Sequence, residues 1–471
     1  MFDPLVTTAT ELRERLEDGK ITSVQIVQEY FAQIDRYNSK LNAFISIAPR
    51  DKVIRAAAAL DEERRCGRIR SPLHGIPIVL KDCFVTDSGL GMSTTAGTWA
   101  FKSAKAATNG HIELCGMKLW TTPGRSAIIG QTLSPYVGYL KEDEGILGHS
   151  SPGGSSTGSA VAVASGFSPL ALGTETIGSI VTPAGRNALY ALKPTVGIQN
   201  SKGMYRMTDF YDSPGPIAKS PSDLSLLSAI LLDQPYDSAT THSDNLSVGL
   251  LAPSIWCLGS EMCRQYGTTA EQMAQDYEKA VSILASHGCK VEYPVKFPNA
   301  DELTVDGKSP VMSIAFWEFK NIGLPGFIQS FETCDVSNLE DLVSFNEANK
   351  HQALPNDTDQ ELLVKSLSCT ESEEDIDHLT KVLRSKAREI VDGVLERSNI
   401  DLIAAPTDSA FATYAAAAGY PLAAVPLGQL EHNKRPFGLC IMAKANQEEK
   451  LLRFQAVYET AVAARPIPEF G

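Results

Sequence analysis

Residues 151–159 read Ser-Pro-Gly-Gly-Ser-Ser-Thr-Gly-Ser, which predicts a loop rich in glycine and serine. Small apolar residues follow at 160–164, as expected of a buried helix that packs closely. The pattern then predicts a strand at 169–172, a loop at 173–179 and a second strand at 189–192. Because strand, loop and helix alternate, we expect an α/β protein.

Core-type segments also lie on either side of this stretch. The apolar run 75–80 ends in Lys81-Asp82 and predicts a strand that is buried on both faces. Near the C-terminus, three further runs have core character: 403–406, 422–425 and 438–442. Capping residues and apolar spacing predict three N-terminal helices, which begin near Thr8, Ser23 and Asp51.

The composition is that of an ordinary globular protein. The chain has 471 residues, of which 43% are hydrophobic and 21% charged. It shows no internal repeat, no low-complexity segment and no linker that would mark a domain boundary. We therefore expect a single domain over 1–471, with its core in 1–250 and 396–471. Longer helical patterns fill 250–395, and we expect this region to surround a pocket.

Charge and cysteine content argue against several classes of protein. Lys and Arg number 42 against 56 Asp and Glu, giving a net charge of −14, so we expect no nucleic-acid partner. The nine cysteines are scattered without a C-x-x-C pair, which argues against a disulfide framework or a zinc site. No apolar run approaches the ~20 residues of a membrane span. Residues 1–4 lack a secretory signal pattern, so we expect a cytoplasmic protein.

Two common catalytic signatures are absent, and the candidate chemistry depends on one lysine and two serine loops. The chain contains no H-E-x-x-H and no Walker lysine loop. His74 and His149 are the only histidines near the glycine-rich segments, and a lone histidine beside a loop is usually structural. Lys81 ends an apolar run, where a charged side chain needs a partner or a function. Taken singly, such a lysine more often reaches to solvent, and a Gly/Ser loop is more often a plain turn.

Together, these segments resemble the amidase signature family over almost the entire chain. The segment 72–82 resembles the family's lysine motif, and 153–158 and 173–180 resemble its two serine motifs at the family's spacing. Five shorter segments complete the match: 9–12, 21–23, 192–195, 419–421 and 436–438. The resemblance implies a large twisted mixed β-sheet that is covered by helices on both faces. It also implies an enzyme without a cofactor or a metal.

The resemblance assigns a role to each residue of the site. Ser179 would be the nucleophile, Ser155 the bridging serine and Lys81 the base, and the peptide bond before Ser155 would be cis. Main-chain N–H groups would stabilise the oxyanion, and the oxyanion and substrate-binding set would comprise Thr176, Ile177, Gly178, Gly154 and Ser156. The chemistry is understandable without the family, because a serine hydroxyl becomes a good nucleophile only when a neighbour takes its proton. A lysine can take it only in the uncharged form, which burial favours.

Three departures from the family's pattern bear on activity. Ile177-Gly178 stands where many members have Gly-Gly, and the Ile177 side chain narrows the loop. Val181 and Glu175 stand where many members have an Arg–Asp pair, which indicates a fungal or plant-like branch of the family. The stretch 95–120 is about a dozen residues shorter than in the family, with the missing piece at 104–112.

The expected function is hydrolysis of a small or apolar amide through an acyl-enzyme on Ser179. Two alternatives stay open: a biosynthetic acyltransferase that uses the same acyl-enzyme, and a weak or inactive amidase-like binding protein. We expect the pocket lining to come from 117–136 and 250–395. Aromatic residues within 316–319, together with Phe327 and Phe331, indicate either an apolar acyl pocket or a packed core. The sequence also leaves a homodimer open.

Overall fold

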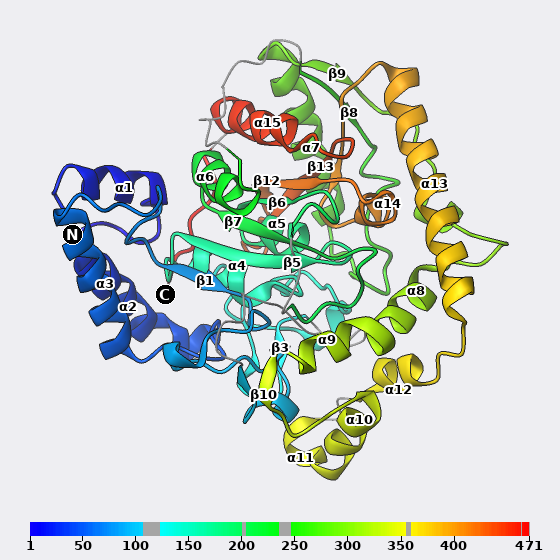
Figure 1. Ribbon diagram of the computed structural model, residues 1–471. Coiled ribbons are helices and arrows are strands. Elements are labelled where there is room, and N and C mark those ends of the chain that lie inside the picture. The colour runs from blue at the N-terminus through cyan, green and yellow to red at the C-terminus, as the bar shows by residue number, and fades with distance from the viewer. Residues whose placement is uncertain (107–122, 200–203, 235–245, 355–358, 463, 471) are drawn as a thin grey trace.

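The computed structural model describes residues 1–106, 123–199, 204–234, 246–354, 359–462 and 464–470 (Figure 1). Its centre is a mixed nine-stranded sheet with the strand order β1-β5-β7-β6-β12-β13-β11-β8-β9. These strands are β1 (Ile78–Leu80), β5 (Leu170–Glu175), β6 (Tyr190–Lys193), β7 (Ser213–Ala218), β8 (Ser247–Leu250), β9 (Lys290–Glu292), β11 (Leu402–Pro406), β12 (Leu422–Gln429) and β13 (Pro436–Met442). The expected mixed sheet is therefore confirmed.

Helices cover both faces of this sheet, as the sequence predicts (Figure 1). One face packs against α4 (Thr157–Ala164), α5 (Val181–Arg186), α13 (Glu373–Ser398) and α14 (Phe411–Ala418). The other packs against α6 (Pro221–Leu231), α7 (Thr269–Ser286) and α15 (Glu448–Ala461). Along β12, Leu422 and Ala424 join the first core and Ala423 and Val425 the second. This alternation follows from the two-residue period of a strand, and it explains why β12 is apolar from Leu422 to Leu427.

Three helices open the chain at the predicted places: α1 (Ala9–Glu17), α2 (Ser23–Leu41) and α3 (Arg50–Arg65). The capping box at the start of α1 is present, because Thr8 and Glu11 exchange side-chain and main-chain hydrogen bonds. On α2, Val27, Phe31 and Ile34 share one face and are buried. Together these helices form a layer beside the β1 end of the sheet (Figure 1).

Two strand predictions need correction. The run 75–80 does not form a strand buried on both faces: β1 is short, lies at the edge of the sheet, and leaves Ile78 38% exposed. It pairs in parallel with β5, with Ile78 opposite Leu170. The loop predicted at 173–179 starts later, because β5 continues to Glu175 through its pairing with β7.

The region 250–395 is mainly helical, as expected. Besides α7 and α13 it contains α8 (Val311–Glu318), α9 (Leu324–Ile328), α10 (Leu339–Ala348), α11 (Lys350–Ala353) and α12 (Glu361–Leu367). Phe319, Phe327 and Phe331 are buried in a separate core cluster with Phe101 and Tyr205. For these three aromatic residues, the packed-core interpretation is therefore the correct one.

Four short strands lie outside the main sheet in the part of the chain that the structure describes. They are β2 (Lys105–Ala106), which pairs with β10 (Phe331–Thr333), and β3 (Arg125–Ser126), which pairs with β4 (Gly130–Gln131). The shortened piece predicted at 104–112 lies largely outside the described residues, which stop at Ala106 and resume at Pro123. Among the helices that the structure describes, none is long and apolar enough to cross a membrane.

Candidate active site

Lys81 and Ser155 meet at the end of β1. The Lys81 Nζ donates to the Ser155 Oγ at 2.7 Å and lies 3.2 Å from the Thr174 Oγ1 and 3.4 Å from the Thr174 carbonyl oxygen. Lys81 and Ser155 are both half-buried. Because β1 pairs in parallel with β5, with Leu80 opposite Leu172, the continued register sets residue 81 opposite residue 173, one position before Thr174. The edge strand thus brings the amine to the two serine loops.

The two serine loops are joined by main-chain and side-chain hydrogen bonds. The Ser156 N–H donates to the Ser179 carbonyl oxygen at 3.0 Å. The Ser156 hydroxyl donates to the Thr174 carbonyl oxygen at 3.0 Å and accepts from the Thr174 N–H at 3.1 Å. Ser156 is fully buried, so its side chain is committed to the loop and does not face a substrate. Its neighbours Ser155 and Ser179 both line the adjacent cavity.

Gly154 has no room for a side chain. The peptide bond between Gly154 and Ser155 is cis, as the family resemblance implied. A Cβ on Gly154 would lie 2.4 Å from the Pro123 Cβ and 2.7 Å from the Thr157 Oγ1, closer than atoms can pack. Only glycine therefore fits between the loop and the start of α4.

The loop from Thr176 to Ser179 presents main-chain groups beside the candidate nucleophile. Within the described residues, no hydrogen-bond acceptor is assigned to the N–H groups of Thr176, Ile177 and Ser179. The Gly178 N–H differs, because it faces the Glu175 carboxyl. Gly178 itself has φ +78°, a conformation that favours glycine. The loop can thus offer several N–H donors to a developing negative charge.

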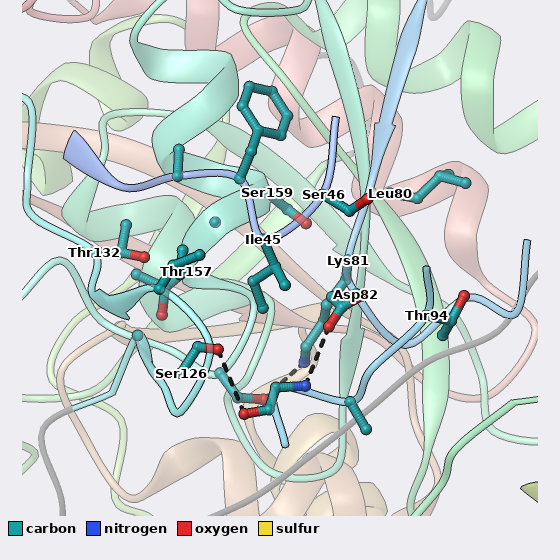
Figure 2. Close-up of a pocket in the computed structure, with 18 of the residues that line it drawn as sticks. Ile45, Ser46, Leu80, Lys81, Asp82, Thr94, Ser126, Thr132, Thr157 and Ser159 are labelled. Carbon is teal, nitrogen blue, oxygen red and sulfur yellow. Dashed lines mark hydrogen bonds between the residues drawn. The ribbon is translucent and has the colours of Figure 1, made fainter. Parts of the chain in front are cut away.

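A cavity of about 570 Å³ opens over this constellation. Figure 2 shows Lys81 and Asp82 at the end of β1, with Ser126, Thr157 and Ser159 from other elements around the same space. Its walls are chiefly apolar, with contributions from α2, the segment 43–48, α10 and α12. The charged side chains among the described lining residues are Lys81, Asp82, Arg125 and Asp359. A site of this kind suits an uncharged ligand.

Comparison with known proteins agrees with this geometry. The amidase family model matches residues 25–112 and 146–452 of the chain. The chain belongs to the amidase signature family. A protein of Schizosaccharomyces pombe named "Putative amidase" is 27% identical over 527 residues, covering 98% of this chain and 86% of the relative. A protein of Arthroderma benhamiae with the same name is 25% identical over 511 residues, covering 98% and 83%.

A solved structure supports the same assignment. The native peptide amidase from Stenotrophomonas maltophilia is 30% identical to this chain, with a TM-score of 0.82 and 99% of each chain covered. The protein described here is therefore a hydrolase of the amidase signature family, whose members act on amide C–N bonds.

Glu175 takes an unexpected part in this amidase. Where many members have an Arg–Asp pair, the Glu175 carboxylate accepts the main-chain N–H groups of Ile180 at 2.8 Å and Val181 at 3.0 Å. Burial raises the pKa of Glu175, and the nearby Lys193 charge opposes this effect. The carboxylate thus braces the residues that follow Ser179 without an arginine partner.

The Ile177 side chain packs away from the main-chain N–H groups of the loop. This half-buried side chain packs against the core cluster that lies beneath α5 and α14. The Ile177 side chain therefore leaves the main-chain N–H groups of the loop uncovered, although it replaces a glycine of many family members.

Sequence reasoning missed a buried charge cluster that braces the approach to Ser155. Arg186 is fully buried, and its Nε donates to the Asp408 Oδ1 at 2.8 Å. Its other nitrogens donate to the carbonyl oxygens of Leu147, Gly148 and Ser151. Arg435 shares the same aspartate, with its Nη1 3.0 Å from the Asp408 Oδ2. The sequence signal for this cluster is Arg186 itself, because a charged residue in an otherwise apolar helix must find a partner.

The two histidines near the glycine-rich segments, His74 and His149, make their contacts away from the candidate active site. The His74 Nε2 lies 2.8 Å from the Leu60 carbonyl oxygen. His149 contacts Arg435, whose Nη2 is 3.0 Å from the His149 Nδ1, and burial lowers the pKa of His149 to about 3. Neither histidine lines the cavity around Ser155 and Ser179. The α2 lining of that cavity was also not foreseen, because its apolar face is indistinguishable from ordinary packing in the sequence.

Proposed function

We propose that this amidase hydrolyses a small or apolar amide through an acyl-enzyme on Ser179, with Ser155 as proton relay and Lys81 as base. The observation that carries the proposal is the 2.7 Å hydrogen bond from the Lys81 Nζ to the Ser155 Oγ, beside a cavity that Ser179 also lines. The serine loops are tied together at this point, which supports a single site for the three groups.

The proposed reaction begins with Lys81 in its uncharged form. The Ser179 Oγ attacks the amide carbonyl carbon and passes its proton to Ser155, which passes its own to the Lys81 amine. Negative charge then develops on the carbonyl oxygen, and the main-chain N–H groups of Thr176, Ile177 and Ser179 stabilise it. The C–N bond breaks, and the departing amine takes the proton back through Ser155. Water next attacks the acyl ester, and its proton returns by the same route to free Ser179.

The substrate proposal follows from the walls of the cavity. Apolar side chains such as Phe31, Ile45 and Leu363 make up most of the lining. Burying an apolar group against such walls is favourable by roughly 25 cal/mol for each Å² removed from water. A charged substrate would find few partners there, so we favour amides with an uncharged apolar acyl or amine part. The peptide amidase among the similar structures makes apolar peptide amides one class to test.

A serine-reactive fluorophosphonate probe tests the nucleophile directly. We expect one label per folded chain, located on Ser179 by peptide mass spectrometry and absent from Ser179→Ala. Labelling of another serine, or no labelling of a folded and homogeneous protein, would contradict the proposal and favour a non-catalytic binding protein. The variant Ser368→Ala, at the end of α12, is the matched control and should label like the wild type.

A panel of aryl, fatty and peptide amides then tests the substrate class. We expect free acid and free amine as products, with turnover rising with the apolar area of the substrate. Product analysis with added hydroxylamine or glycine amide separates hydrolysis from acyl transfer. Transfer products that outnumber the free acid at low amine concentration would favour the acyltransferase alternative.

A further inference from the structure

Asp212 lies across the sheet from the start of the loop that carries Ser179. It directly precedes β7, which pairs antiparallel with β5 and places Ser213 opposite Glu175. Continuing this register by one residue sets Asp212 opposite Thr176, where β5 ends and the loop begins. Asp212 is thus connected by the sheet itself to the loop that presents the main-chain N–H groups.

The Asp212 carboxylate is held by main-chain N–H groups of the segment that precedes β7. Its Oδ2 accepts the main-chain N–H of Met207 at 2.6 Å and that of Thr208 at 3.4 Å. Burial raises the pKa of Asp212 to about 6, while the Thr176 hydroxyl and the Lys81 charge favour the ionised form. At neutral pH the group is therefore a half-buried carboxylate, adjacent to Thr176 and within electrostatic range of Lys81.

Side chains alternate along the end of β5, so that Thr174 and Thr176 lie on one side of the strand and Glu175 on the other. Thr174 faces Lys81, since the Lys81 Nζ lies 3.2 Å from its Oγ1. Glu175 points to the opposite side and accepts the N–H groups that follow Ser179. Thr176 returns to the first side and lies opposite Asp212 in the continued register of β5 and β7. The strand end therefore aligns Lys81, Thr174, Thr176 and Asp212 along one side.

We propose that Asp212 is a positioning residue for the acyl-transfer reaction. Its carboxylate fixes Thr176 and, through it, the direction of the main-chain N–H groups between Thr176 and Ser179. It touches neither Ser155 nor Ser179 in the described structure and acts through the loop. This inference rests on the proposed function, because it assigns a purpose to the loop only if Ser179 forms the acyl-enzyme.

The test compares Asp212→Asn with a matched neighbour. Asn keeps the shape and an acceptor for the Met207 N–H, but it removes the charge that faces Thr176. Asp209→Asn changes an aspartate three residues earlier, whose side chain is 47% exposed and pairs with Arg206 at 2.7 Å. Each variant is first titrated with the fluorophosphonate probe, so that kcat is expressed per reactive Ser179. We expect kcat of Asp212→Asn to fall about 10- to 100-fold with KM within about twofold, because loop misalignment impairs the transition state more than binding. Asp209→Asn should match the wild type.

A second variant keeps the inference testable if Asp212→Asn does not fold. Thr176→Val removes the hydroxyl that faces Asp212 and keeps the side-chain shape. We expect it to lower kcat in the same manner, and the double variant to be no worse than Asp212→Asn alone, because both changes break one contact. A wild-type kcat per labelled site in folded Asp212→Asn or Thr176→Val would overturn the inference. So would a loss that appears only as a smaller labelled fraction, since that is the signature of a purely structural role. Failure of the wild type to label at Ser179 would instead overturn the proposed function.

Discussion

The Ser156 main-chain N–H donates to the Ser179 carbonyl oxygen at 3.0 Å. This bond links two loops that are separated by more than twenty residues in the sequence and places the candidate nucleophile beside Ser155. Ser156 itself is buried and bonded on both sides of its hydroxyl. Ser155 and Ser179, which line the cavity, are therefore held in place by Ser156, which does not line it.

Ser179→Ala and Ser155→Ala are expected to have unequal effects. Loss of the nucleophile removes acyl transfer altogether, so amide hydrolysis by Ser179→Ala should fall by orders of magnitude, about 10⁴-fold or more. Loss of the relay leaves the nucleophile in place, so Ser155→Ala should retain slow labelling by the fluorophosphonate probe. Steady-state hydrolysis and labelling rates check both. Wild-type turnover in Ser179→Ala would refute the assignment of the nucleophile.

Substitutions of Lys81 separate its charge from its role as a base. Lys81→Met keeps the length and removes the amine, and Lys81→Arg keeps the positive charge on a group that remains protonated. If Lys81 is the base, both variants should lose hydrolysis by orders of magnitude. Activity retained in Lys81→Arg would mean that only a positive charge is needed. The exposed lysine Lys381, which forms an ion pair with Asp377 on α13, supplies the control Lys381→Met.

Asp408→Asn should destabilise the fold. The substitution leaves the buried guanidinium groups of Arg186 and Arg435 without their shared counter-charge, and breaking a buried pair costs about 3–5 kcal/mol. The more exposed pair of Asp401 and Lys450 offers a control, because an exposed pair contributes about 0–1 kcal/mol. Urea unfolding of Asp408→Asn and Asp401→Asn measures both. Equal losses in the free energy of unfolding would contradict the importance of the buried cluster.

The same carboxylate predicts a pH dependence of stability. Burial alone would raise the pKa of Asp408, but the Arg186 and Arg435 charges outweigh it and lower that pKa to about 2. A carboxylate with a depressed pKa binds protons more weakly in the folded state than in the unfolded state. Its contribution, about 2 kcal/mol, is thus present above pH ~4 and lost as the pH falls towards ~2. The free energy of unfolding should drop more steeply between these values in the wild type than in Asp408→Asn.

Two glycine substitutions should affect different properties: one should reduce hydrolysis, and the other should raise the free energy of unfolding. A Cβ on Gly154 would overlap Pro123 and Thr157, so Gly154→Ala should displace Ser155 and reduce hydrolysis strongly. Gly326 lies inside α9, and no atom approaches within 4 Å of an added Cβ. Gly326→Ala should therefore raise the free energy of unfolding by about 0.5–1 kcal/mol and leave activity unchanged. Thermal unfolding and an amide assay check the two changes, and an active Gly154→Ala would show that the loop is more tolerant than its packing indicates.

Much of the architecture could be predicted because it depends on local pattern. Apolar runs gave the places of β5, β6, β11, β12 and β13, and capping residues gave the N-terminal helices. The motif spacing led to Lys81, Ser155 and Ser179, which the fold brings to one cavity. The exposure of β1 was predicted wrongly, because a run of apolar residues does not reveal whether its strand lies at the centre or the edge of a sheet.

The α/β class, the family and the candidate lysine and serines can be predicted from the sequence, since they follow from residue type and spacing along the chain. The folded chain alone shows that Ser156 braces the loops, that Arg186 and Arg435 share Asp408, and that Asp212 lies opposite Thr176. Such partners lie on separate strands and loops. A hydrogen bond or buried charge is satisfied by whichever group the folded chain brings within about 3 Å, and sequence distance does not encode that choice.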